Sequence, residues 1–228
     1  MIGRLVFVRH GVTHWNREGR FQGRLDPGLS EEGQEEARLM AERLAAESLR
    51  PARIISSPLS RARETADAIL AALEKEEVEM ELDPRLMEVG QGEWEGHTHD
   101  ELAVSDPVRY AAWRDALAGE RQPPGGEPLP DAIGRVSDVL DEAIRSSNRE
   151  SAWPLCLVSH GGTLRLAAHV LLEIPLERVW RLELDNASIS VMDRMNGQWR
   201  IVTWNDGAHL LGHAPVHVDE EDGRPLAL

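Results

Sequence analysis

Cysteine is nearly absent from this sequence, which holds only Cys156 among its 228 residues. A single cysteine excludes an internal disulfide and a metal site built from several thiolates of one chain. Because Cys156 lies within the apolar run from Leu155 to Val158, we expect it to be a buried structural residue.

Long hydrophobic runs are absent as well. No apolar stretch approaches the roughly 18 residues that a membrane-spanning helix requires. The first residues lack a basic flank, an apolar segment and a small-residue cleavage site, so a secretory signal is not expected. We therefore expect a cytoplasmic protein with no membrane partner.

Positive charge is also scarce, since the formal net charge is -15 and Lys75 is the only lysine. Non-specific nucleic-acid binding depends on clustered positive charge, so nucleic acid is not an expected partner. An acidic protein that binds an anion must concentrate its cations locally, and arginine is suited to forked contacts with phosphate. The arginines that converge in the fold are therefore of most interest.

Hydrophobic residues make up 41% of the chain, which is ample for a sizeable core. Leu5 to Val8 is a continuous apolar run, and it predicts a buried parallel strand that ends at Arg9-His10-Gly11. Ser30 offers an N-cap for the next element, because apolar residues at helical spacing follow it. We expect a helix over about 30–48.

The same alternation continues further along the chain. Ile54-Ile55 starts a second strand, and Ser57-Pro58 supplies a cap and a first-turn proline for a helix through about Leu73. Leu155 to Ser159 forms another apolar strand, which ends in His160-Gly161-Gly162 and leads into a helix to about residue 172. This unit copies the layout of the first strand and the turn that follows it, although the sequence holds no internal repeat.

A segment over about 84–130 breaks the alternation, because it is rich in glycine, proline and tryptophan. We expect it to be an insertion in a single domain over 1–228, with a mobile acidic tail after about residue 217. The remaining predicted elements are short helices near 98–104 and 107–117, a helix over 131–147, strands over 179–184, 189–192 and 199–204, and a hairpin turn at Asn196-Gly197. The predicted class is α/β with a mixed, mainly parallel sheet.

Ligands of such sheets bind beyond the carboxyl ends of the strands. Four residues are expected at that edge: Arg9 and His10 after the first strand, Arg61 in the first turn after the second, and His160 after a later one. Taken singly, each has an ordinary structural explanation. The pattern Val-x-His-Gly nevertheless occurs twice, at Val8–Gly11 and Val158–Gly161, both at predicted strand-to-helix junctions. Together the four would form a compact cationic pocket suited to a phosphoryl group.

Further landmarks follow in order between about residues 4 and 205. They are Arg9-His10-Gly11 with Thr13 and Asn16, Gln22-Gly23, Asp26, Leu29-Ser30 and Gly33; Ser57-Pro58-Leu59 with Arg61-Ala62 and Thr65-Ala66; Glu88 with Gly92 and Trp94-Glu95-Gly96; Ser159-His160-Gly161-Gly162 with Arg165; and Asn186 before Ser188. In these motifs the sequence resembles the histidine phosphatase superfamily, to which phosphoglycerate mutases also belong. The resemblance implies a three-layer α/β/α sandwich of the phosphoglycerate mutase-like type.

The resemblance also implies roles for individual residues. His10 is the expected nucleophile that forms a phosphohistidine, and nearby Arg9 and Arg61 should disfavour its protonated form. His160 joins the two arginines in stabilising the charge of the phosphoryl group, and Glu88 is the expected general acid and base. Four further residues are expected to bind substrate: Asn16, Gln22, Gly23 and Gly161. No metal and no cofactor are expected.

Phosphatases and mutases of this family share the core, and the insertion favours the phosphatase branch. Glu88 to Gly96 and Pro124-Gly125-Gly126-Glu127 resemble that branch, whereas Val12 and Pro128 depart from it and leave substrate preference open. We therefore expect a phosphatase of small phosphorylated metabolites. A 2,3-bisphosphoglycerate-dependent phosphoglycerate mutase is the first alternative, and a non-catalytic phospholigand-binding protein is the second.

Other chemistry-bearing residues have weaker claims. His97 and His99 lie in the insertion, and His209, His213 and His217 have spacings that could bind a metal, but we expect scattered surface residues rather than a metal site. Trp94 is expected to pack rather than to stack on substrate. A homodimer is compatible with the sequence, which leaves the oligomeric state open.

Overall fold

The computed structural model describes residues 3–46, 49–73, 78–150 and 154–211. These parts contain a six-stranded sheet of order β3-β2-β4-β1-β5-β6. The strands are β1 (Gly3–Arg9), β2 (Arg53–Ser56), β3 (Glu79–Leu82), β4 (Leu155–Ser159), β5 (Ile189–Met195) and β6 (Gln198–Asp206). The first four pair in parallel, and β5 pairs antiparallel with both β1 and β6, so the expected mixed, mainly parallel sheet is confirmed.

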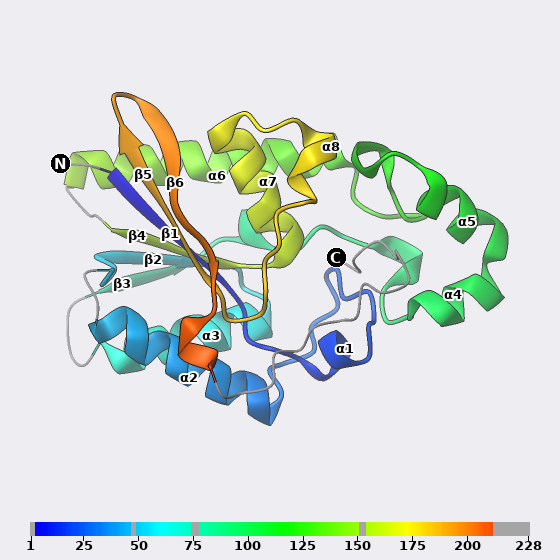
Figure 1. The fold of residues 1–228 in the computed structure, drawn as a ribbon, viewed down its shortest axis with the longest axis horizontal. Coiled ribbons are helices and arrows are strands. Elements are labelled where there is room, and N and C mark those ends of the chain that lie inside the picture. Colours follow the sequence, from blue (N-terminus) through cyan, green and yellow to red (C-terminus); the bar gives the residue numbers. More distant parts are fainter. Residues whose placement is uncertain (1–2, 47–48, 74–77, 151–153, 212–228) are drawn as a thin grey trace.

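Helices cover both faces of the sheet. Figure 1 shows α2 (Glu31–Ala46) and α3 (Ser60–Ala72) below the sheet, and α6 (Leu129–Glu150), α7 (Gly161–Leu172) and α8 (Leu176–Val179) above it. The expected three-layer α/β/α arrangement is thereby confirmed. None of the helices in the described parts is both long and apolar enough to cross a membrane.

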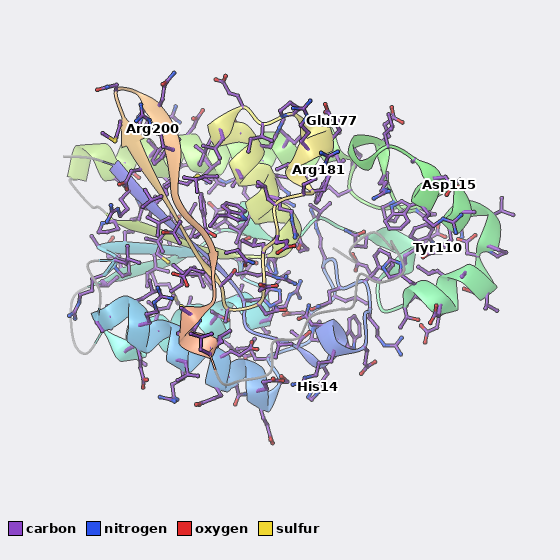
Figure 2. The ribbon with its side chains drawn as sticks, in the orientation of Figure 1. His14, Tyr110, Asp115, Glu177, Arg181 and Arg200 are labelled. Carbon is purple, nitrogen blue, oxygen red and sulfur yellow. The ribbon has the colours of Figure 1, made fainter. Side chains whose placement is uncertain are left out.

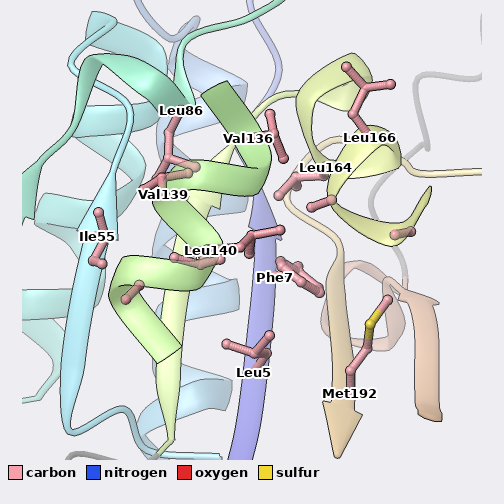
Figure 3. Close-up of a cluster of buried hydrophobic side chains, with 14 of the residues drawn as sticks. Leu5, Phe7, Ile55, Leu86, Val136, Val139, Leu140, Leu164, Leu166 and Met192 are labelled. Carbon is pink, nitrogen blue, oxygen red and sulfur yellow. The ribbon is translucent and has the colours of Figure 1, made fainter. Parts of the chain in front are cut away.

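Strand β1 shows why the sequence forms three layers. Leu5 and Phe7 belong to the apolar cluster beneath α6 and α7, whereas Val6 and Val8 belong to the cluster against α2 and α3. All four are at most 1% exposed. Because successive side chains of a strand point to opposite faces, a run that is apolar at every position needs cover on both. Figure 3 shows the first cluster, with Leu140 of α6 beside Phe7.

The segment between β3 and α6 breaks the alternation as expected. It contains α4 (His99–Ser105), α5 (Pro107–Asp115) and the short 3-10 helices η1 (Pro84–Leu86), η2 (Gly92–Trp94) and η3 (Ala118–Glu120). Four of its side chains form a separate apolar cluster with Phe21 from the loop after α1 (His14–Arg17): Trp94, Leu102, Tyr110 and Trp113. Figure 2 places Tyr110 and Asp115 at this end of the molecule, beyond the carboxyl ends of the parallel strands. Trp94 packs inside the cluster, as predicted.

Two further expectations are confirmed. Cys156 is buried in β4 at the centre of the sheet. Asn196 and Gly197 both have positive φ, 53° and 84°, as an Asn-Gly hairpin turn between β5 and β6 requires. The expected tail after residue 217 lies outside the described residues.

Two expectations about elements are wrong, and one strand was not expected. Residues 179–184 form no strand, because Pro175 starts α8 instead, and the carbonyls of Leu182 and Leu184 then accept bonds from arginines rather than from a sheet neighbour. Strand β3 was not predicted, since charges alternate along this edge strand. Ser57 is not the cap of α3, because Asp26 accepts the amide of Ser60 there, at 2.7 Å.

Candidate active site

The two Val-x-His-Gly patterns lie side by side because their strands are neighbours. β1 and β4 pair in parallel, with Arg9 opposite Ser159, so the next residue of each strand reaches the same edge of the sheet. The amide of His10 donates to the carbonyl of Ser159, at 3.0 Å. The ring centroids of His10 and His160 are 5.1 Å apart. The two histidines that the sequence places at strand ends are thus brought together.

His10 is held as a neutral imidazole. Its Nδ1 lies 2.7 Å from the carbonyl oxygen of Gly11, which can only accept, so Nδ1 carries the proton and Nε2 the lone pair. Burial, followed by the charges of Arg61 and Arg9, lowers the pKa of His10 well below its ordinary value, against the opposing effect of the Gly11 bond. The expected effect of the two arginines is confirmed.

Arg61 is fully buried in the first turn of α3. Its Nη2 and Nη1 donate to the carbonyls of Gly23 and Leu25, each at 2.9 Å, and its Nε donates to Nδ1 of His160 at 3.2 Å. Burial lowers its pKa to about 10, so the guanidinium remains a cation at neutral pH. A guanidinium has five N–H donors, and these bonds use three of them. The other two make no hydrogen bond to any described residue, and the carboxylate of Asp26 lies 3.7 Å from Nη1.

His160 does not add positive charge to this site, and the expectation of a pocket made cationic by histidines as well as arginines is wrong. Since Nδ1 accepts from Arg61, Nε2 carries the proton, and it lies 2.8 Å from the hydroxyl oxygen of Ser57. Burial, then the charge of Arg61, lowers the pKa of His160 well below its ordinary value. His160 therefore orients Arg61, and the arginines alone supply the charge.

Arg9 supplies the second guanidinium. Its Nη1 donates to the carbonyl of Leu184, whereas its buried Nε has no hydrogen-bond partner among the described residues. A buried donor without an acceptor costs free energy that an anionic ligand would recover. The guanidinium lies beside the start of α7, where a Cβ on Gly161 would make ordinary contact with Arg9 Cζ at 3.5 Å and a tighter one with Arg165 Nη1 at 3.1 Å. The Nε–H group of Arg9 is thus available to donate a hydrogen bond to a phosphoryl oxygen.

Glu88 lies at the N-terminus of α7. Its Oε2 accepts from the amide of Gly162 at 3.0 Å, and its Oε1 accepts from the amides of Thr163 at 3.0 Å and Val89 at 2.8 Å. The hydroxyl of Thr163 is 3.2 Å from Oε1. Its negative charge acts on both arginines, since it raises the pKa of Arg9 and Arg61 against the larger effect of their burial. The carboxylate is therefore fixed close to the two cations.

Asn16 and Gln22 line the loop after β1, within α1 (His14–Arg17) and just beyond it. The Oδ1 atom of Asn16 accepts from the amide of Thr13 at 3.0 Å, in a capping box, and this leaves its amide NH2 as the donor. Gln22 is joined to the same threonine, whose hydroxyl is 3.2 Å from Oε1. Gly23 contributes through its carbonyl, which holds Arg61. Gly23 thus acts through its backbone, and the side chain of Gln22 is held beside Thr13.

Sequence reasoning missed two side chains at this site. Asn186 donates from Nδ2 to the carbonyl of His10 at 3.0 Å and contacts the Gly11 carbonyl and Asn16 Oδ1 at 3.4 Å. The hydroxyl oxygen of Ser57 accepts a hydrogen bond from Nε2–H of His160. Both residues belong to the motifs named in the sequence analysis, so the sequence did single them out. A motif does not reveal, however, which group of the site each side chain contacts.

The histidines without a predicted role lie elsewhere. His99 is buried and bonded to the hydroxyl of Tyr110 at 3.0 Å, which corrects the expectation of a surface residue, and Nε2 of His209 meets the carbonyl of Ala187. His213 and His217 lie outside the described residues. Across the described parts of the chain, no three histidine, cysteine, aspartate or glutamate side chains gather as a metal site would need.

Comparison with known proteins gives one consistent family. The model of the histidine phosphatase superfamily (branch 1) matches residues 5–207. Phosphoserine phosphatase 1 of Hydrogenobacter thermophilus is 34% identical, over 91% of this chain and 94% of its own length. Glucosyl-3-phosphoglycerate phosphatase of Mycolicibacterium vanbaalenii is 33% identical, over 92% and 97%. A probable phosphoglycerate mutase of Erwinia tasmaniensis is 34% identical, over 88% and 89%.

Solved structures agree with the sequences. A mycobacterial glucosyl-3-phosphoglycerate phosphatase in complex with VO3 superposes with a TM-score of 0.77 at 32% identity, over 89% of this chain and 99% of the other. A putative alpha-ribazole-5'-phosphate phosphatase of Escherichia coli gives a TM-score of 0.79 at 26% identity, over 91% and 98%. With a match across nearly its whole length, this chain belongs to the histidine phosphatase superfamily.

Proposed function

We propose that this protein is a phosphatase of small phosphorylated metabolites that works through a phosphohistidine on His10. The observation that carries the proposal is the state of this residue: a buried, neutral imidazole with Nδ1 bonded to Gly11 and Nε2 free to attack. The guanidinium groups of Arg9 and Arg61 lie close enough to lower its pKa. A neutral imidazole can attack phosphorus with its Nε2 lone pair, and the two neighbouring cations can stabilise the negative charge of the phosphoryl group.

The reaction has two balanced steps. In the first, Nε2 of His10 attacks phosphorus, the bond from phosphorus to the substrate oxygen breaks, and Glu88, in its protonated form, gives that oxygen a proton so that it leaves as an alcohol. In the second, a water oxygen attacks phosphorus, the nitrogen–phosphorus bond breaks, and Glu88 takes a proton from the water. Inorganic phosphate is released, and both residues return to their starting states.

Charge stabilisation falls to the remaining residues. Arg9 and the two N–H groups of Arg61 that make no hydrogen bond to the described residues bind the equatorial phosphoryl oxygens, over which the charge of the transition state is spread. His160 keeps Arg61 oriented by accepting its Nε proton. The amide NH2 of Asn16 is a neutral donor, and the small Gly161 admits the phosphoryl group close to the backbone.

The relatives support the substrate class. Their names give phosphoserine and glucosyl-3-phosphoglycerate as substrates, and an Arabidopsis thaliana relative, 34% identical, is called a metal-independent phosphoserine phosphatase. We accordingly propose metal-independent hydrolysis in the cytoplasm, where such metabolites are made and used. We also propose that the chain is one catalytic domain, whose segment between β3 and α6 shapes the pocket rim.

The test is phosphate release from a panel of phosphoserine, 3-phosphoglycerate and p-nitrophenyl phosphate in the presence of a chelator, beside a 2,3-bisphosphoglycerate-dependent isomerisation assay. We expect hydrolysis by the wild type, an acid-labile phosphoenzyme, and loss of both in His10→Ala. His169→Ala, at the far end of α7, is the matched control and should keep the activity. Isomerisation without hydrolysis would make the protein a mutase, and an unchanged rate in His10→Ala would exclude the nucleophile.

A further inference from the structure

Arg135 and Glu127 form an ion pair beside the segment that carries the proposed general acid. Arg135 Nε is 2.7 Å from Glu127 Oε1, and Nη2 is 2.9 Å from Oε2, which is a forked geometry. Their side chains are 13% and 10% exposed. Burial alone would raise the pKa of Glu127, but the bond and charge of Arg135, with smaller effects of Gly90 and Arg24, outweigh it and lower the pKa. The pair is therefore charged at neutral pH.

The pair holds the backbone on both sides of Glu88. Before this residue, Arg135 Nη1 donates to the carbonyl of Met87 at 2.7 Å. After it, the amide of Gly90 donates to Glu127 Oε2 at 3.2 Å, and the Glu127 amide donates to the Gly90 carbonyl at 2.8 Å. Residues 87–91 belong to no helix or strand, so no ladder of regular backbone hydrogen bonds holds them. The bonds to Arg135 and Glu127 fix the backbone here instead.

Glu127 also reaches the loop that holds the pocket arginine. Its Oε1 accepts from Arg24 Nη2 at 3.0 Å. Arg24 stands between Gly23 and Leu25, whose carbonyls bind the guanidinium of Arg61. Hydrogen bonds and the covalent chain of Arg24 thus connect Arg61, through the ion pair, to the backbone on both sides of Glu88.

We propose that Arg135 and Glu127 are positioning residues for Glu88, because their fork places its carboxyl group where it can protonate the departing oxygen. The inference rests on the proposed function, in which Glu88 is the general acid. A buried ion pair stabilises a fold little more than apolar residues of the same size would, whereas it does fix geometry. Loss of the fork should therefore impair proton transfer more than phosphoryl binding.

The experiment compares a leaving group that needs a proton with one that does not. We measure kcat/KM, which covers the steps through phosphoenzyme formation, for p-nitrophenyl phosphate and for whichever of phosphoserine and 3-phosphoglycerate the wild type hydrolyses faster. Nitrophenolate leaves as a stable anion, but an alkoxide must be protonated. Glu88→Gln sets the scale, since general acid catalysis contributes about 100-fold to 10,000-fold and should be lost mainly for the alkyl phosphate.

Arg135→Met is expected to lower kcat/KM for the alkyl phosphate by about tenfold or more and for p-nitrophenyl phosphate by less than about threefold. Glu127→Gln should act in the same direction, and it serves where Arg135→Met fails to fold. Arg135→Lys, which keeps the charge but not the fork, should regain part of the alkyl phosphate rate. The matched control is Arg4→Met, which removes the forked pair with Asp193 at the opposite end of β1 from His10 and should leave the ratio of the two kcat/KM values unchanged.

An equal fall for both substrates in the folded variants would overturn the inference, because the fork would then serve only the fold. Equal falls in Glu88→Gln would remove Glu88 as the acid, and the fork would have nothing to position. A wild type that hydrolyses none of these compounds would instead refute the proposed function itself. The three negative results are distinguishable, because the first appears in the variants of the ion pair, the second in Glu88→Gln and the third in the wild type.

Discussion

The rings of His10 and His160 lie 5.1 Å apart and are tilted by 58°, yet their hydrogen bonds assign them opposite tautomers. Nδ1 of His10 donates to a carbonyl, whereas Nδ1 of His160 accepts from a guanidinium. The proton therefore sits on Nδ1 of the first ring and on Nε2 of the second. Two residues from one repeated pattern thus have different capacities: one keeps a free lone pair at Nε2, and the other uses its lone pair to hold Arg61.

The pH dependence of stability should show that both rings are neutral in the folded state. Their folded pKa values lie well below the unfolded value of about 6.5, so at lower pH the unfolded chain takes up protons that the folded chain does not. The stability that these groups contribute is present above about pH 6.5 and is lost as the pH falls. Each histidine should cost about 1.4 kcal/mol per pH unit below that point. Urea unfolding between about pH 7 and about pH 5 measures the slope.

The double variant His10→Gln, His160→Gln provides the comparison for this slope. Neither glutamine titrates, so its free energy of unfolding should depend less steeply on pH in the same range. Equal slopes for the variant and the wild type would mean that the histidines take up protons in the folded state, contrary to the hydrogen bonds described above.

Gly162→Ala should reduce activity without unfolding the protein. A Cβ at this position would lie 2.7 Å from Glu88 Oε1, so the carboxylate must shift away from the amides of Gly162 and Thr163 that hold it. The displaced carboxylate should lower kcat/KM by about tenfold to 100-fold, since small misplacements of catalytic groups have effects of this size. The free energy of unfolding should fall by about 1–3 kcal/mol, because hydrogen bonds of a buried group are weakened, and the protein should stay folded.

Gly134→Ala in α6 is the matched control for that substitution. No atom lies within 4 Å of a Cβ built there, so activity should be unchanged and helix propensity should favour the variant by up to about 1 kcal/mol. Full activity in folded Gly162→Ala would show that the position of Glu88 at the start of α7 is not required.

The sequence predicts the fold well where burial alone decides the pattern. The run from Leu5 to Val8 is apolar at every position, and the structure buries both of its faces. The apolar residues over 179–184 predicted a strand because their spacing resembles one. The residues instead form a turn, whose carbonyls accept hydrogen bonds from arginines of β1 and α7. The spacing of apolar residues alone does not reveal which groups form hydrogen bonds with the backbone.

The same limit applies to the site. Strand ends predict that His10 and His160 meet, because parallel neighbours share an edge. The neutral state of His160 depends on a guanidinium from α3, and the position of Glu88 depends on α7 and on Arg135 of α6. These contacts join segments far apart in the chain, so only the folded structure reveals them.

Cys156 should resist thiol reagents in the folded protein. It is fully buried in β4, between β2 and β1, and burial raises the pKa of its thiol to about 12. Alkylation by iodoacetamide should therefore be negligible until the sheet opens, and one thiol per chain should react in urea. Ala103→Cys adds a thiol at an exposed position of α4, and that one should react at once. Rapid native labelling of the wild type would contradict the central position of β4.

Asn186→Asp should lower kcat while leaving KM nearly unchanged. The amide NH2 of Asn186 donates to the carbonyl of His10 at 3.0 Å and lies 3.4 Å from the carbonyl of Gly11, which fixes the nucleophile's tautomer. An aspartate would place a negative oxygen against these carbonyls, so the loop must shift and the Gly11 bond to His10 must weaken. Loss of one such hydrogen bond should lower kcat by about tenfold.

Two measurements separate this effect from a general loss of structure. Asn196→Asp makes the same chemical change in the exposed hairpin turn, where aspartate also tolerates positive φ, and it should keep the wild-type kcat. Nitrogen-15 NMR of the histidine rings should show that the Nδ1–H form of His10 loses population in Asn186→Asp but not in Asn196→Asp. If kcat falls while the His10 tautomer stays unchanged, Asn186 acts on the loop by another route, because the proton on Nδ1 would then need no help from its neighbour.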